Sequence, residues 1–253
     1  MTKLDIFKIV FSKRDEEKDI TIPKYLTPEL AEDIGIHIGD GSMYSKKGSK
    51  NANAITISSN INEIDYLKYV IDIKKRLYNL NKYRILERNN ERNLRFHSLA
   101  ISTFYNTIFN LPIGKKDDID IPELIKNSKD QEIIISFVRG IIDTDFGLSG
   151  KNRHGKIYPC LEGSSKSKKL IKSIANIFDK LNINYYLEYD VNRFDKRTNK
   201  ITIINKIILN GFKRINLFFR IVQPKNSKYI KKMKKMWARG DLNSRPLAFL
   251  NSC

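Results

Sequence analysis

The fold is decided by two stretches of similar pattern, LTPELAEDIGIHIGDGS at residues 26–42 and QEIIISFVRGIIDTDFG at residues 131–147. Each is predicted to be an apolar helix, because its hydrophobic side chains recur at the three- and four-residue spacing of one helix face. Each closes on an aspartate, Asp40 in the first stretch and Asp145 in the second. Each also carries small residues at every fourth position: Ala31, Gly35 and Gly39, and Ser136, Gly140 and Thr144.

These small residues predict that the two helices form an interface. Residues four apart lie on one face of a helix, and small side chains let two helix backbones approach closely. Glycine inside a helix costs about 1 kcal/mol relative to alanine, so Gly35 and Gly39 need a packing reason. Taken alone, one stripe indicates only helix packing, and Asp40-Gly41 is typical of a turn. The duplication of both features favours the interface.

The aspartates that end the two helices predict a metal site. If the helices pack side by side and parallel, Asp40 and Asp145 emerge close together, and two like charges held close need compensation. A hard divalent cation, Mg²⁺ or Mn²⁺, takes carboxylate oxygens and accepts phosphate oxygens. Such a site can activate a water for phosphodiester hydrolysis. The backbone next to this predicted catalytic site belongs to Gly39, Gly41, Thr144 and Phe146.

The segments after each helix also repeat, which predicts two units of order α-β-β-α-β-β-α. The first has strands at 41–47, 54–59, 83–88 and 93–98, with helices at 62–78 and 100–109. The second has strands at 146–151, 156–162, 185–190 and 200–209, with helices at 167–181 and 211–221. The predicted organisation is an N-terminal extension (1–25), a first unit (26–110), a linker (111–128), a second unit (129–230) and a basic, disordered tail (231–253).

Composition points to a polyanionic partner. The chain has 47 Lys and Arg against 28 Asp and Glu, a formal net charge of +19. Such a charge favours nucleic acid, because each neutralised phosphate releases condensed counterions. Two cysteines without zinc-like spacing argue against a disulfide framework or a zinc site. With no membrane-spanning pattern and no leader-like segment, the expected location is intracellular: cytoplasmic, nucleoid-associated or organellar.

The segments DIGIHIGDG (33–41) and VRGIIDTDF (138–146) resemble the LAGLIDADG motif of the homing endonucleases. The resemblance implies an α+β fold of two pseudo-symmetric units, whose antiparallel sheets form a saddle on double-stranded DNA. It implies motif helices at the interface, with Asp40 and Asp145 on the metal. It also implies a monomer that cuts both strands of a long asymmetric target and leaves short 3′ overhangs. Two positions depart from the motif: Ile38 replaces its first acidic residue, and Phe146 its closing glycine.

Polar side chains at alternate strand positions are predicted to face the DNA. In the first unit they are Tyr44, Lys46, Thr56, Ser58, Arg84, Arg88, Arg92 and Arg95. In the second they are Lys151, Arg153, Lys156, Glu188, Arg193, Lys196, Arg197, Lys200 and Asn205. Lys206 is the predicted basic helper of catalysis, and His37 is predicted to be a core histidine rather than a ligand.

Other interpretations remain open at the level of sequence. An intron-RNA maturase or a DNA-binding regulator could share the fold without cutting DNA. Asp40 and Asp145 favour cutting, although a maturase could retain both. An intein-embedded copy is disfavoured because the chain starts with Met1. A basic structural protein leaves the duplicated motif unexplained.

Overall fold

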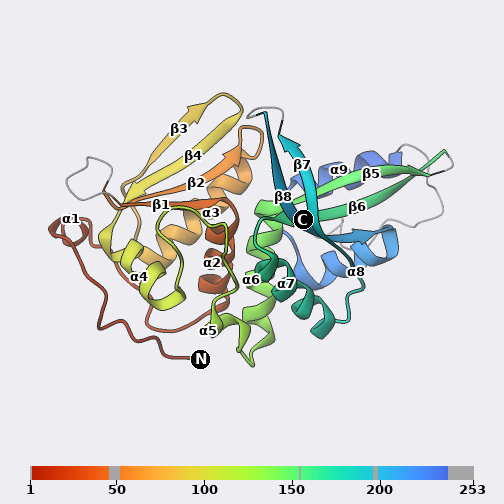
Figure 1. Ribbon diagram of the computed structural model, residues 1–253. Helices are drawn as coiled ribbons and strands as arrows, with labels where there is room; N and C mark the ends of the chain where they lie inside the picture. The colour runs from red at the N-terminus through yellow and green to blue at the C-terminus, as the bar shows by residue number, and fades with distance from the viewer. Residues whose placement is uncertain (1, 46–51, 154, 196–198, 239–253) are drawn as a thin grey trace. The chain divides into compact units, whose positions relative to one another are not determined.

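The computed structural model describes residues 2–45, 52–153, 155–195 and 199–238, and the chain divides into two compact units, residues 1–144 and 145–253 (Figure 1). The elements of the first unit are α1 (Lys13–Glu16), α2 (Pro28–Asp40), β1 (Gly41–Tyr44), β2 (Ala54–Asn60), α3 (Ile64–Tyr78), β3 (Arg84–Arg88), β4 (Glu91–His97), α4 (Leu99–Phe109), α5 (Glu123–Lys126) and most of α6 (Gln131–Asp145). The elements that follow are β5 (Phe146–Arg153), β6 (Lys156–Ser165), α7 (Lys168–Lys180), β7 (Tyr186–Asp195), β8 (Lys200–Asn210), α8 (Phe212–Val222) and α9 (Lys228–Ala238). The predicted α+β class and the repeated order of elements are confirmed.

The two units contain equivalent antiparallel sheets. The strand order is β1-β2-β4-β3 in the first unit and β5-β6-β8-β7 in the second (Figure 1). Alternation of side chains gives each sheet an apolar face and an exposed face. In the first sheet the apolar face carries Ile55, Ile57, Leu94 and Phe96, each at most 1% exposed. In the second, α7 and α8 contact β6 and β8, while α9 contacts β5 and β6.

The core of the first unit contains an ion pair on the motif helix. Asp33 of α2 and Lys74 of α3 are fully buried, with 2.6 Å between Oδ1 and Nζ. The hydroxyls of Tyr78 and Tyr105 both donate to Asp33 Oδ2, at 2.7 and 2.5 Å. Burial lowers the pKa of Lys74, and Asp33 partly offsets that effect. The pair fixes α2 against α3 and α4, because removing either charge would strand the other in the core.

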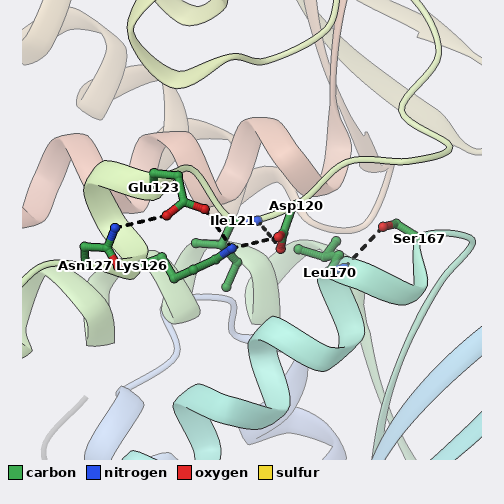
Figure 2. Close-up of polar contacts among 7 residues, drawn as sticks. All are labelled: Asp120, Ile121, Glu123, Lys126, Asn127, Ser167 and Leu170. Atoms are coloured by element: carbon green, nitrogen blue, oxygen red, sulfur yellow. Dashed lines mark hydrogen bonds and ion pairs between the residues drawn. The ribbon is translucent and has the colours of Figure 1, made fainter.

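The linker is packed rather than loose. Its short helix α5 places Lys126 Nζ 2.8 Å from Asp120 and 3.0 Å from Glu123, as Figure 2 shows. Ile121 and Ile125 are buried beside them. Figure 2 also shows the start of α7, where Ser167 caps the helix by accepting the backbone N–H of Leu170.

The predicted start of a disordered tail at residue 231 is wrong, because helix α9 continues to Ala238. Its apolar side chains, Tyr229 and Met233, are 1% and 2% exposed. The Tyr229 hydroxyl donates to the carbonyl of Phe146 at 2.9 Å. Dense lysines hid this four-residue apolar spacing in the sequence. Residues 239–253 lie outside the described chain.

None of the helices in the described ranges is long and apolar enough to pass through a membrane.

Candidate metal centre and nucleic-acid interface

Helix α2 carries Asp40 directly to the first sheet. The helix begins at a side-chain cap, where Thr27 Oγ1 accepts the Leu30 N–H at 3.2 Å. It ends at Asp40, and the extended Gly41 starts β1 without a loop. A Cβ on Gly41 would lie 2.4 Å from His37 Nδ1, so a side chain cannot be placed there without movement. The half-buried Asp40 is thus held at an abrupt helix-to-strand junction.

Helix α6 carries Asp145 to its own sheet in the same way. Asp145 is the last helical residue, it is exposed, and Phe146 starts β5 at once. Phe146 replaces the motif's glycine, and its side chain is 3% exposed. A Cβ on Gly163, its cross-strand partner, would lie 2.3 Å from the Phe146 ring. The aromatic ring is therefore accommodated because the residue opposite it has no side chain.

The two motif helices contact each other through glycines, as their stripes predict. A Cβ on Gly35 would lie 2.3 Å from the Phe137 carbonyl oxygen, and one on Gly140 would lie 2.2 Å from that of Glu32. Both positions therefore require glycine for backbone-to-backbone packing. The other stripe residues are buried or half-buried, and their part in the interface stays a prediction: Ala31, Gly39, Ser136 and Thr144.

An ion pair across this helix contact was not predicted. Glu32 of α2 and Arg139 of α6 have 5% and 13% exposed side chains, with 2.9 Å between Oε2 and Nη1. Tyr69 of α3 donates to the other Glu32 oxygen at 2.7 Å. Burial, and then the charge of Glu32, raises the pKa of Tyr69 above its ordinary value. A glutamate inside an apolar helix pattern was the available signal, since such a residue needs a partner when buried.

Lys116 of the linker lies at the C-terminal end of α2, which the sequence did not reveal. Its ammonium donates to the carbonyls of His37, Ile38 and Gly39, at 3.2, 2.6 and 2.7 Å. Carbonyls in the last turn of a helix carry partial negative charge and mostly lack intrahelical donors; the His37 carbonyl also accepts a hydrogen bond from the Gly41 N–H. A positive charge therefore lies at the backbone immediately before Asp40. A linker lysine shows no periodicity from which this could be predicted.

His37 is a core residue, as predicted. It is 1% exposed, and its ring centroid lies 4.6 Å from that of Tyr105. Its Nδ1 has no hydrogen-bond partner among the described residues. Burial lowers the pKa of His37 well below 6.5, and the nearby charges of Lys74 and Lys116 lower it further.

Lys206 of β8 lies on the exposed face of the second sheet between two glutamates. Its Nζ is 3.3 Å from Glu162 of β6 and 3.6 Å from Glu188 of β7. These acids partly neutralise the lysine. Its role as the basic helper of catalysis stays a prediction.

The exposed face of the first sheet gathers most of the predicted DNA-facing residues. Pairing in register places Ser42, Thr56, Arg95 and Arg84 in one row across the four strands. Tyr44, Ser58 and Arg88 alternate onto the same face, and Asn93, hydrogen-bonded to Ser58 at 2.6 Å, joins them unpredicted.

Arg92 does not lie on the exposed face of the first sheet, where it was predicted to face the DNA. It pairs with Glu87 at 2.6 Å and donates to the Ile61 carbonyl, on the opposite face of the sheet. The prediction was wrong because neighbouring strand residues point to opposite faces, so Arg92 and Arg95 cannot share one. Lys46 lies outside the described residues.

On the second sheet, the prediction that Asn205 faces the DNA is wrong. It is 2% exposed, its amide donates to the Lys166 carbonyl at 3.0 Å, and its oxygen accepts from the Asp190 N–H. It therefore holds the irregularity between Glu188 and Val191 instead of facing DNA. The exposed residues Lys151, Glu188, Arg193 and Lys200 remain available for contact. Lys196 and Arg197 lie outside the described residues, as do the side chains of Arg153 and Lys156.

The donor set suits a hard cation held partly by water and substrate. Among the described residues, no group of three or more His, Cys, Asp or Glu side chains is placed to hold a metal ion. Asp40 and Asp145 are single carboxylates, each at a helix end. Mg²⁺ is commonly bound through one or two carboxylates and completes its shell with waters and phosphate oxygens. The residues present are compatible with that mode.

Comparison with known proteins finds one family model that resembles part of the chain. A family model described as LAGLIDADG-like domain matches residues 132–215. Comparison with curated proteins finds no match. The match covers part of the second half of the chain.

Solved structures extend the likeness to most of the chain. Mesophilic variants of the homing endonuclease I-DmoI are similar with a TM-score of 0.52 at 16% identity, over 78% of this chain and 96% of theirs. The LAGLIDADG homing endonuclease I-GzeII, in complex with its DNA target, gives 0.51 at 14%, over 87% and 94%. A variant of I-SmaMI gives 0.54 at 11%, over 87% and 92%. The chain therefore has the fold of the two-motif LAGLIDADG homing endonucleases.

Proposed function

We propose that this protein is a site-specific DNA endonuclease that uses Mg²⁺ or Mn²⁺ to hydrolyse phosphodiester bonds. The observation that carries the proposal is the pair of motif helices, joined at Gly35 and Gly140 and each ending in an aspartate at the first strand of a sheet. Structures of the same fold support it, since I-DmoI has been solved in complex with DNA and Mn.

The residues have distinct roles in this proposal. Asp40 and Asp145 are carboxylate ligands, and a bound cation would supply a more acidic water and Lewis acidity at a phosphate oxygen. The exposed sheet faces lie in the DNA major groove, where arginine and asparagine read bases and lysine contacts phosphates. The chain acts as a monomer on a long asymmetric target and leaves short 3′ overhangs.

Two lysines compete for the role of basic helper. Lys206 belongs to the exposed face of the second sheet, but Glu162 and Glu188 offset its charge. Lys116 holds the backbone turn before Asp40 and brings a positive charge to it. Lys116 is therefore expected to matter more for the rate of cutting than Lys206, because its ammonium binds the carbonyls that immediately precede Asp40.

The test is cleavage of a randomised-site plasmid library with Mg²⁺ by wild type, Asp40→Asn and Asp145→Asn. Each variant is expected to lose about 10²- to 10³-fold in cutting rate, the scale of removing one group that stabilises the transition state. Duplex binding in Ca²⁺ should be retained. Asp72→Asn, a change of an exposed aspartate on α3, is the matched control and should cut normally.

The same assay separates the lysines and the alternatives. Lys116→Met is expected to slow cutting more than Lys206→Met. A wild type that binds duplex DNA tightly but never cuts would contradict the endonuclease proposal and leave a DNA-binding regulator. Equal cutting by wild type and both aspartate variants would remove Asp40 and Asp145 from the site.

A further inference from the structure

The N-terminal extension and the β3–β4 hairpin enclose a basic cavity of about 550 Å³ in the first unit. Arg14 and Lys18 contribute from the extension. Arg84 and Arg95 contribute from the hairpin, and Lys82 from the segment before it. No acidic side chain is among the described residues that line it, so the cavity concentrates positive charge without an internal counterion.

The two arginines of the hairpin are placed where an anion could bind both of them. Arg84 and Arg95 are directly opposite each other on adjacent strands, on the exposed face. Like charges at directly opposed positions destabilise a sheet. Arg95 Nε is also buried and has no hydrogen-bond partner within the described chain. An anion between the arginines would relieve the repulsion and supply an acceptor for the buried donor.

The extension that brings Arg14 and Lys18 to the cavity is fixed to the unit. Asp15, between them in sequence, is fully buried. Its Oδ2 accepts the N–H groups of Leu99 and Ala100, both at 3.2 Å, at the start of α4. Lys18 Nζ donates to the His97 carbonyl at 3.1 Å. The cavity is therefore built by packed structure and not by a loose basic tail.

We propose that this cavity binds a backbone phosphate of the DNA, so that the DNA contact extends from the first sheet onto the N-terminal extension. Arginine forks match phosphate oxygens, and a phosphate carries the charge that five cations attract. Arg84 and Arg95 share a row with Thr56 and Ser42 on the proposed DNA face, which makes the cavity continuous with it. The inference rests on the proposed function and adds residues outside the motif units to it.

The experiment compares Arg14→Gln/Lys18→Gln with Lys8→Gln/Lys13→Gln in Ca²⁺, by the salt dependence of affinity for one long, fixed DNA duplex. Both variants remove two charges from the extension, but Lys8 and Lys13 are exposed and do not line the cavity. Each phosphate contact adds about 0.9 to the slope of log affinity against log salt. The cavity variant is expected to lower that slope by about one, the contribution of a single phosphate contact. The control should leave it unchanged.

Replacing Lys18 could disturb the fold, because Lys18 donates to the His97 carbonyl. The single variant Arg14→Gln avoids this effect, because the Arg14 side chain is exposed. It is expected to lower the slope by about one with an unchanged melting temperature. Duplex binding with equal slopes for all variants contradicts this inference alone. A wild type that does not bind the duplex contradicts the proposed function as well. Stabilisation of wild type, but not of the cavity variant, by inorganic phosphate, with unchanged duplex slopes, would assign the cavity to free phosphate and overturn the DNA assignment.

Discussion

At the scale of residues, the first motif packs against two neighbours: the core of the first unit, and helix α6. Asp33 and His37, four apart on α2, point into the core of the first unit, where they meet Lys74 and Tyr105. Gly35 lies against α6. Asp33 and His37 of the motif are thus committed to the core, and Asp40 lies beyond them at the end of the helix. This explains how the motif can depart from the family pattern and still form its helix.

His37 makes stability depend on pH. Because burial lowers its pKa in the folded state well below 6.5, His37 stays neutral in the fold while the unfolded chain binds a proton below pH 6.5. The unfolded state then binds more protons, so the free energy of unfolding falls as pH falls. Between pH 7.5 and 5.5 the expected loss is about 1 to 1.5 kcal/mol.

Urea unfolding at the two pH values measures this loss. His37→Gln, which cannot titrate, is the control, and its free energy of unfolding should change less over the same interval. Equal pH dependence in both proteins would show that other groups control the acid sensitivity.

Two residues were assigned to the wrong face of a sheet, because side chains alternate between the two faces of a strand. Arg92 was assigned to the DNA face, but its strand position turns it toward Glu87. Asn205 was assigned there too, although it holds the irregularity between β7 and β8. Sequence does not show where a strand pairing shifts, and a shift of one residue exchanges the faces. Lys116 was missed because its target, a helix end, has no side-chain signal.

At the scale of elements, the motif helices were predictable because period and glycine spacing agree. Gly35 and Gly140 recur in two helices, and the structure shows carbonyl oxygens where their side chains would be. Helix α9 was not predicted, because lysines fill the positions between its apolar residues Tyr229 and Met233.

Gly35→Ala tests the helix contact. The added Cβ would lie 2.3 Å from the Phe137 carbonyl oxygen, which is backbone and cannot rotate away. The helices must separate, and overpacking of this kind costs about 1 to 3 kcal/mol, more than the gain in helix propensity. Gly147→Ala is the matched control, since nothing lies within 4 Å of its added Cβ. Guanidinium unfolding compares the two, and equal stability would contradict the glycine contact.

At the scale of the whole molecule, the duplication could be predicted from the sequence, and the differences between the two copies could not. The repeated order of elements and the position of Asp40 and Asp145 follow from local pattern. The first unit alone has the packed N-terminal extension, while α9 packs on the second sheet. These additions depend on contacts between distant segments, which a single sequence does not show.

The net charge of +19 belongs to this scale, and it predicts how steeply salt weakens DNA binding. A protein with six to ten phosphate contacts loses about 10³- to 10⁵-fold in affinity between about 50 and 200 mM salt. Fluorescence anisotropy of one labelled duplex in Ca²⁺ measures the loss. Asp40→Asn should keep the same slope, because it alters a proposed metal ligand and no proposed phosphate contact. An affinity that hardly changes with salt would mean that the basic residues only face solvent and do not contact phosphates. That result would remove the electrostatic argument for a DNA partner.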